Sequence, residues 1–229
     1  MFRKFFKKNN FKLFLVGLVF TLVCFFRFFF QEDFLQGDYW KIFIFYGGAF
    51  FLLPWGIIHF FFQQKTEDYF WGKFNFAHFE KRKVENLLFI FWIGFFGLIM
   101  LKSDQWKNFP ISPWILGRWE LVLFLDFTLL PLILFFQEFF YRGFLLKIFS
   151  ERLNLWGAVV FQALLAIGFE TFFIGRAFLV GIVLFVFYCF LGWVSWRQKN
   201  FLYSWWLIFL SGLFFDLVVK YKIFSLLNK

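Results

Sequence analysis

The stretch QEFFYRGFL, residues 137–145, places an amide, a carboxylate and a guanidinium among Phe and Leu residues. Glu138 and Arg142 are four residues apart, so a helix would carry both side chains on one face, with the acid before the base, which is the favoured order. Gln137 is rotated by about 100° from Glu138 and would meet a different neighbour. The spacing predicts either a self-neutralising ion pair or part of a functional site.

The composition determines where these side chains must lie. The chain has 229 residues, of which 62% are hydrophobic, with 49 Phe and 12 Trp. A water-soluble domain of this length could not bury so many large apolar side chains. Apolar runs of about 20 residues, the length that crosses a hydrocarbon core, recur along the sequence. We therefore predict an all-α fold, a polytopic transmembrane helical bundle that forms a single domain over residues 1–229.

Seven apolar runs are candidate spans, and the bundle could also have six or eight. For a protein of this class, the predicted partner is the lipid bilayer. The formal net charge of +10 is expected to reflect basic cytoplasmic loops, and no nucleic-acid partner is predicted. The predicted spans are Leu13 to Phe30, Ile42 to Phe62, Val84 to Leu101, Trp119 to Phe136, Leu155 to Ile174, Ala177 to Trp196 and Phe201 to Val219.

Lys and Arg are distributed unevenly among the loops, and this distribution predicts the orientation. The loop between the first two spans is acidic, whereas the amino terminus and the next loop are basic, which predicts a cytoplasmic amino terminus. Three lysines at the carboxyl end oppose an odd number of spans. The basic residues concerned are Arg3, Lys4, Lys7, Lys8, Lys12, Lys65, Lys73, Lys81, Arg82 and Lys83, and the acidic ones are Glu32, Asp33 and Asp38.

Four more acidic residues lie in the predicted spans, where an ionisable group needs a partner or a function. Glu120 is one residue inside its span, so we expect an interfacial position. Asp126 lies deeper and is either a helix–helix hydrogen-bonding residue or a cavity residue. Glu170 lies in the fifth span and Asp216 in the seventh.

The segment QEFFYRGFL resembles the first signature of the CPBP family, the CAAX-protease and bacteriocin-processing intramembrane proteases. That signature is EExxxR, followed by Gly, an aromatic or aliphatic residue, and Leu. The resemblance extends over about residues 68–216, and TEDYFWGKFNF at 66–76 is similar to the family's loop before its third span. It implies a helical membrane bundle that hydrolyses peptide bonds, in which a glutamate and two histidines activate a water directly or through a metal.

The residues that would carry this chemistry differ at three positions. Glu138, Arg142 and Asp216 match family positions, but Gln137 replaces the first glutamate, and an amide cannot serve as a general base. In ALLAIGFETF Glu170 occupies the position aligned with the first histidine, and in SWWLIFLSGLFFD Gly212 occupies that of the second. The resemblance therefore implies a protease scaffold with degenerate catalytic motifs.

Metal binding of the family type is not expected. The only histidines are His59 and His78, both of which precede the first motif, and neither has the spacing of a metal site. We expect solvated or interfacial histidines, no zinc, and no other cofactor. If a carboxylate cluster held an ion, a hard cation such as Mg or Mn would fit better than zinc.

Three functions remain open. The first is a catalytically silent relative that acts as a membrane scaffold or binds a peptide or membrane-protein partner. The second is a divergent hydrolase in which Glu138, Glu170 and Asp216 converge on one cavity and share protons. The third is a proton-coupled transporter-like bundle. For the first function we expect an ion pair between Arg142 and Glu170 at a remodelled active-site floor.

Overall fold

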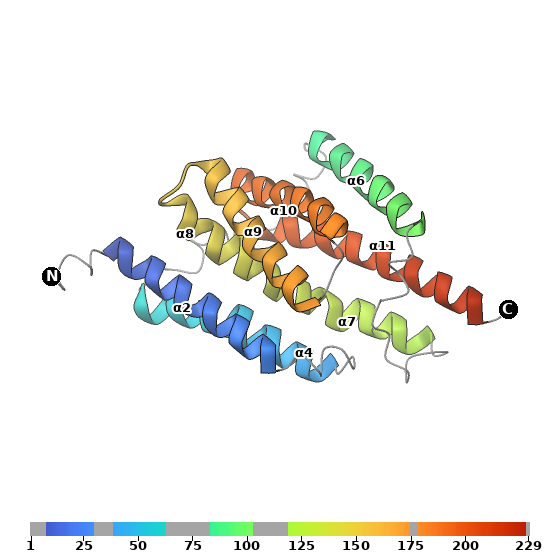
Figure 1. Ribbon diagram of the computed structural model, residues 1–229, viewed down its shortest axis with the longest axis horizontal. Helices are drawn as coiled ribbons and strands as arrows, with labels where there is room; N and C mark the ends of the chain where they lie inside the picture. The colour runs from blue at the N-terminus through green and yellow to red at the C-terminus, as the bar shows by residue number, and fades with distance from the viewer. Residues whose placement is uncertain (1–7, 30–38, 63–82, 103–118, 175–177, 228–229) are drawn as a thin grey trace.

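The computed structural model describes residues 8–29, 39–62, 83–102, 119–174 and 178–227, and all regular structure in these ranges is helical (Figure 1). The all-α prediction is confirmed for this part of the chain. The elements are α2 (Lys8–Phe29), α4 (Tyr39–Phe45), η1 (Tyr46–Leu52), α5 (Leu53–Gly56), η2 (Ile57–Phe61), α6 (Lys83–Lys102), α7 (Trp119–Glu138), η7 (Phe139–Leu145), α8 (Leu146–Ser150), α9 (Leu155–Ile174), α10 (Phe178–Gln198) and α11 (Phe201–Leu227).

Each of the seven predicted apolar runs coincides with a helix or with a continuous series of helical elements. Among the described residues, three segments are long and apolar enough to cross a membrane: Trp40–Phe61, Leu123–Ser150 and Gly181–Gln198. Four shorter apolar stretches lie in the remaining helices: Phe14–Cys24, Glu85–Phe95, Leu155–Phe169 and Phe201–Phe214. The chain is thus a helical membrane protein.

Large apolar side chains cover much of the outer surface. Phe60, Phe91 and Trp40 are each about 70% exposed, at 70%, 72% and 69% respectively. Exposed apolar area on this scale marks a surface that meets lipid or another protein, because contact with water would be unfavourable. The outward positions of these residues agree with a helical membrane protein.

The helical segment from Trp119 to Ser150 continues well past the predicted end of the fourth span at Phe136. The helix therefore does not end where the predicted span ends. The helix continues because Phe and Leu residues flank the two charged residues on both sides. A charge pair on one helical face also lowers the free-energy cost of burying the two charges. The pair lies in the interior of the segment.

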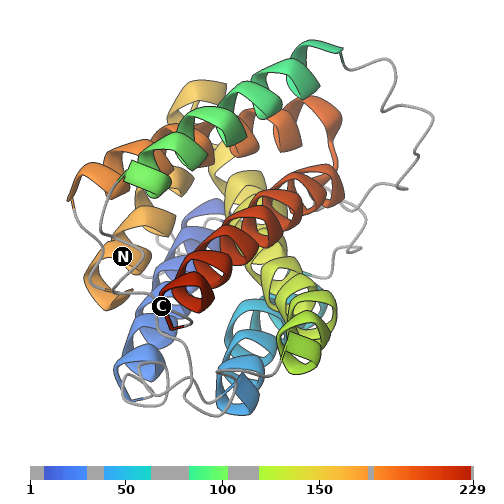
Figure 2. The same cartoon turned by 90° about the vertical axis from the view of Figure 1, so that its right-hand side faces the viewer.

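Element η7 is the centre of the packing. It contacts α9, α10, α11 and η1, and all seven of its residues are buried. Figure 2 shows α11 crossing the middle of the bundle beside α7, while α6 lies at the edge. Residues 139–145 are therefore surrounded by four other elements, which fixes the surroundings of Arg142.

Three elements, η1, η2 and η7, are π-helical, which the sequence did not predict. Two of them pack against each other through aromatic rings. Phe50 of η1 lies 4.8 Å from Phe140 and 5.7 Å from Tyr141 between ring centroids, and Phe51 lies 5.1 Å from Phe139. The wider π-helical turns are thus stabilised by edge-to-face and tilted ring contacts worth about 1 kcal/mol each.

Charged residues join the ends of helices, at the starts of α2 and α6, after α8 and near the end of α10. Lys12 near the start of α2 pairs with Glu151 after α8 at 3.1 Å. Arg197 near the end of α10 pairs with Glu85 near the start of α6 at 2.8 Å. Lys12, one of the basic residues of the amino-terminal region, is buried in this ion pair. These two ion pairs hold together the ends of helices that are far apart in the sequence.

Two polar residues define the turns near these helix ends. Asn154 accepts a hydrogen bond from the Gly157 amide at 2.7 Å and caps the start of α9. Lys199 follows α10 with φ 51°, and the amide of Asn200 donates to the Ser195 carbonyl at 3.2 Å. The latter pattern is a Schellman motif, in which a left-handed residue ends the helix. The α10–α11 turn is therefore well defined, and it sets the register of both helices.

Candidate functional site

The candidate site is a buried cluster of four polar residues, called the polar cluster below: Glu138, Arg142, Ser195 and Ser204. Arg142 Nη1 donates to Glu138 Oε1, and the two side chains are 1% and 0% exposed. This confirms the self-neutralising pair that the four-residue spacing predicted. Both groups are brought inside by the buried face of the α7–η7 segment.

Two serines extend the pair across three helices. Ser204 on α11 donates to Glu138 Oε2 at 2.6 Å, and Ser195 on α10 donates to Ser204 Oγ at 2.8 Å. The Ser204 oxygen also lies 2.8 Å from the Phe201 carbonyl, but its single proton is better used on the charged carboxylate. The chain of donors therefore runs from Ser195 through Ser204 to Glu138.

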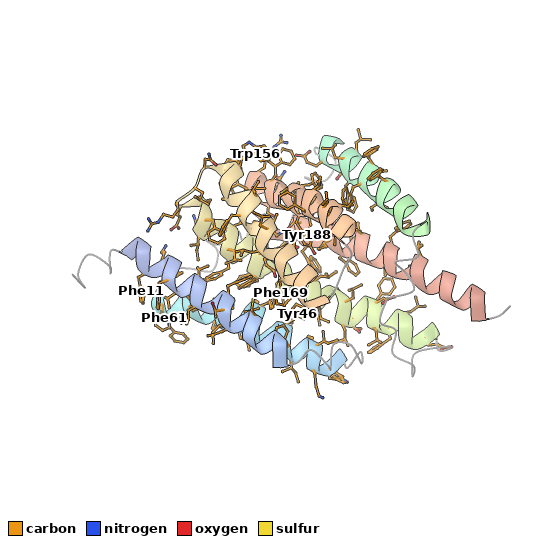
Figure 3. The ribbon with its side chains drawn as sticks, viewed as in Figure 1. Phe11, Tyr46, Phe61, Trp156, Phe169 and Tyr188 are labelled. Atoms are coloured by element: carbon orange, nitrogen blue, oxygen red, sulfur yellow. The ribbon has the colours of Figure 1, made fainter. Side chains whose placement is uncertain are left out.

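The guanidinium of Arg142 is also held by an aromatic face. Its Cζ atom lies 4.6 Å from the centroid of the Tyr188 ring on α10 and 5.9 Å from that of Tyr141. Figure 3 shows Tyr188 in the interior of the bundle. A desolvated cation over an aromatic face gains about 2 kcal/mol, which offsets part of the cost of burying the arginine.

A second buried polar residue clamps α9 to α10. Gln162 is fully buried, and its Nε2 atom donates to the carbonyls of Val159 and Tyr188, both at 3.1 Å. Gly192 permits this approach, because a Cβ there would lie 2.5 Å from Gln162 Nε2. Tyr188 is therefore fixed through its backbone by Gln162 while its ring supports Arg142.

Ser195, Ser204 and Gln162 were not predicted from the sequence, because they carry no charge that would mark them within an apolar span. The signal that would have found them is a neutral hydrogen-bonding side chain inside an apolar span, since such side chains bond across helices in membranes. Spacing alone could not have told which of the buried serines reaches Glu138, because the partners are 66 residues apart.

The other predicted site residues lie apart from the cluster or outside the described side chains. Gly212 faces α7, where an added Cβ would meet Leu134 Cδ1 at 3.5 Å. Gln137 is half-buried beside Glu138. Glu170 and Asp216 belong to α9 and α11, but their side chains are not among those described, so their convergence with Glu138 stays a prediction.

Along their helices, Asp216 and Asp126 are both far from the residues of the polar cluster. Asp216 follows Ser204 by twelve residues in the continuous helix α11, which corresponds to about 18 Å along its axis. Asp126 precedes Glu138 by a similar length of α7 and is itself buried. The role of Asp126 is therefore distinct from that of the polar cluster.

Metal ligands do not gather in the described part of the chain: no group of three His, Cys, Asp or Glu residues there could hold an ion. His59 is exposed and stacks on Trp55 with 5.6 Å between ring centroids. His78 lies outside the described residues. Within the described ranges, the chemistry of the site is thus that of one ion pair and its hydroxyl donors.

The chain was compared with protein-family models, with curated protein sequences and with solved structures, and none of the three comparisons returned a match. The functional conclusion therefore rests on the geometry of the polar cluster and on the resemblance of residues 137–145 to the CPBP signature.

Proposed function

We propose that this chain is a multi-pass membrane scaffold or binding protein that is built on a CPBP-like bundle and does not hydrolyse peptides. The observation that carries the proposal is the state of Glu138. Both carboxylate oxygens are engaged, one by Arg142 and one by Ser204, and the side chain is 0% exposed. Donors of the protein take two of the lone-pair sites of this carboxylate, and its burial keeps bulk water away, so we assign Glu138 a structural role.

Two further features support a non-catalytic role. Gln137 stands at the first glutamate of the motif, where an amide cannot accept a proton from water. Gly212 stands where the resemblance implies a histidine, and Asp216 lies about 18 Å along α11 from the serine that contacts Glu138. Groups that act as a unit lose their rate together when several are replaced.

A peptidase assay tests the proposal. The protein in lipid nanodiscs is incubated with a prenylated carboxyl-terminal peptide and with a leader peptide, and cleavage is followed by mass spectrometry. We expect no product above the level of empty nanodiscs. Turnover that disappears in Glu138→Gln, in a variant that keeps the wild-type fluorescence spectrum, would establish the hydrolase instead. Turnover that is equal in both proteins comes from a contaminant.

We propose further that seven segments cross the bilayer and that the amino terminus is cytoplasmic. More of the basic residues of the described helices lie at the ends joined by the Lys12–Glu151 and Arg197–Glu85 pairs than at the opposite ends, which favours a cytoplasmic location for the former. The basic residues at the joined ends are Lys8, Lys12, Lys83, Lys147, Arg152, Arg197 and Lys199. Those at the opposite ends are Arg27, Lys41, Lys102, Lys220 and Lys222.

Cysteine labelling tests this topology. In a background without Cys24 and Cys189, a membrane-impermeant maleimide is added to intact cells expressing Leu153→Cys or Lys41→Cys, both of which are at exposed positions. We expect labelling of position 41 in intact cells and of position 153 only after lysis. The reverse pattern would invert the orientation, and equal access to both in intact cells would overturn the span count.

A further inference from the structure

Arg142 uses only one of its three nitrogens on Glu138. Within the described part of the chain, its Nε and Nη2 atoms meet no hydrogen-bond acceptor, although the side chain is 1% exposed. Nε–H and one N–H of Nη2 are parallel and form one edge of the guanidinium fork, which suits an acceptor that takes two hydrogen bonds. A complete two-donor edge inside the bundle is therefore unused by these residues.

The direction of this edge is fixed by two contacts. Glu138 holds the opposite nitrogen, Nη1, and the Tyr188 ring lies 4.6 Å from Cζ and restrains the guanidinium plane. Tyr188 is in turn held through its carbonyl by Gln162 at 3.1 Å. Buried donors that lack an acceptor are costly, and native proteins place a water or a ligand against them. A pre-oriented edge of this kind has the properties of a binding site.

The local backbone gives independent support. Arg142 lies in the π-helical element η7, all of whose residues are buried. A π-helical turn inside an α-helix is energetically unfavourable and occurs frequently at functional sites. Here it sets the direction of the only residue in η7 that carries a charge.

Charge balance indicates what the edge would bind. Glu138 and Arg142 already neutralise each other. A second carboxylate or a phosphate at the edge would leave a net negative charge in a medium of low dielectric, whereas a neutral oxygen adds none. The favoured occupant is thus an uncharged oxygen acceptor.

We propose that the Nε–Nη2 edge of Arg142 binds a neutral oxygen acceptor inside the bundle, in place of the Glu170 carboxylate that the sequence predicts there. The acceptor is supplied by an internal water or by the amide carbonyl of a bound peptide. The inference rests on the proposed binding function only where the occupant is a peptide. The site needs no catalytic activity, so a negative result in the test below and a positive result in the peptidase assay can be told apart.

Nitrogen-15 NMR of arginine-labelled protein in nanodiscs tests the site, with Arg142→Lys identifying the Arg142 Nε–H signal. The probes are N-methylacetamide and, at equal concentration, sodium acetate. Arg197 is the internal control, because it also donates through Nη1 to one carboxylate but is 54% exposed. We expect the amide to move the Arg142 signal downfield at concentrations that leave Arg197 unchanged, and acetate to leave both unchanged.

Each outcome bears on the proposal. A shift with the amide identifies a carbonyl site, and a cross-peak from Nε–H to water without that shift identifies an internal water; both support the inference. A larger response to acetate than to the amide would overturn it, as would the absence of both the shift and the water cross-peak. If Arg142→Lys does not fold, a high-resolution structure of the wild type decides, because an occupant would lie about 2.9 Å from both nitrogens.

Discussion

The hydroxyl of Ser204 on α11 donates to Glu138 Oε2 on α7 at 2.6 Å, a contact between residues 66 positions apart. Ser204 is itself the acceptor of Ser195 at 2.8 Å. One side chain thus connects the ion pair of the α7–η7 segment to both carboxyl-terminal helices, so the stability of the bundle should depend on this hydroxyl more than on other buried serines.

Ser204→Ala should lower the free energy of unfolding by about 1–3 kcal/mol, because it leaves a buried carboxylate oxygen without its donor. Ser211→Ala is the matched control. Ser211 is on the same helix and is 2% exposed, but its hydroxyl donates only to the Ile208 carbonyl at 2.9 Å. Thermal unfolding in detergent, followed by Trp fluorescence, should show a clear fall for position 204 and a small one for 211. Equal falls would contradict the link to Glu138.

Arg142→Met should cost about 3–5 kcal/mol, because it leaves the Glu138 carboxylate buried without a counter-charge. The double variant Arg142→Met, Glu138→Leu should recover most of that loss. Ser204 does not become an orphan in the double variant, since its hydroxyl can turn to the Phe201 carbonyl, 2.8 Å away. Equilibrium unfolding of the four proteins of the double-mutant cycle measures the coupling. A double variant as unstable as the single would show that Arg142 stabilises the fold through contacts other than this pair.

Two glycines should respond in opposite ways to alanine. A Cβ at Gly192 would lie 2.5 Å from Gln162 Nε2, so Gly192→Ala should displace the amide from both of its carbonyl acceptors and cost about 1–3 kcal/mol. A Cβ at Gly212 would meet Leu134 at an ordinary 3.5 Å. Gly212→Ala should therefore be neutral or stabilise by up to about 1 kcal/mol through helix propensity. Thermal unfolding in the same detergent compares them, and a stable Gly192→Ala would disprove the Gln162 clamp.

Lys199 ends α10 in the left-handed region, with φ 51°. Lys199→Gly should be more stable than Lys199→Ala by about 1 kcal/mol, because both lose the contact with the Trp196 ring at 4.2 Å but only glycine adopts this φ without strain. Chemical denaturation of the two variants gives the difference. Equal stabilities would show that the turn does not keep this φ.

The same lysine predicts a pH dependence. Partial burial lowers the pKa of the Lys199 ammonium below its ordinary value, and the nearby Lys147 lowers it further. A base whose pKa is lower in the folded state destabilises the fold below that pKa, and the penalty fades as the pH rises toward the pKa of the unfolded chain. Stability should therefore rise slightly with pH in the alkaline range, and Lys147→Gln should reduce the rise. An unchanged slope in Lys147→Gln would contradict the coupling between the two lysines.

The sequence predicted the helices well because each is a long apolar run bounded by charged residues, Pro or Gly. It also predicted the Glu138–Arg142 pair, since a four-residue spacing on one helix is local information. It did not predict where the segment ends: Phe136 is followed by two charges, and only their neutralisation and the packing of η7 explain why the helix continues to Ser150. The π-helical turns depend on ring contacts such as Phe50 with Phe140, which no local pattern encodes.

The polar cluster shows a similar division. Glu138 and Arg142 could be found because charges are rare in apolar segments. Ser204 could not be assigned to Glu138, because the pairing depends on how α11 crosses α7. Glu170, Asp216 and the expected Arg142–Glu170 pair stay predictions, since they concern side chains outside those described.

The local spacing of the charge pair also matters during synthesis. The segment from Trp119 to Ser150 leaves the ribosome well before α11 exists, so its acid must enter the translocon without the help of Ser204. Because Arg142 follows Glu138 by a single helical turn, the two charges cancel as soon as that turn forms. The nascent segment can therefore enter the lipid before α11 is made. The Ser204 hydroxyl of α11 then bonds to a Glu138–Arg142 pair that is already inside the membrane.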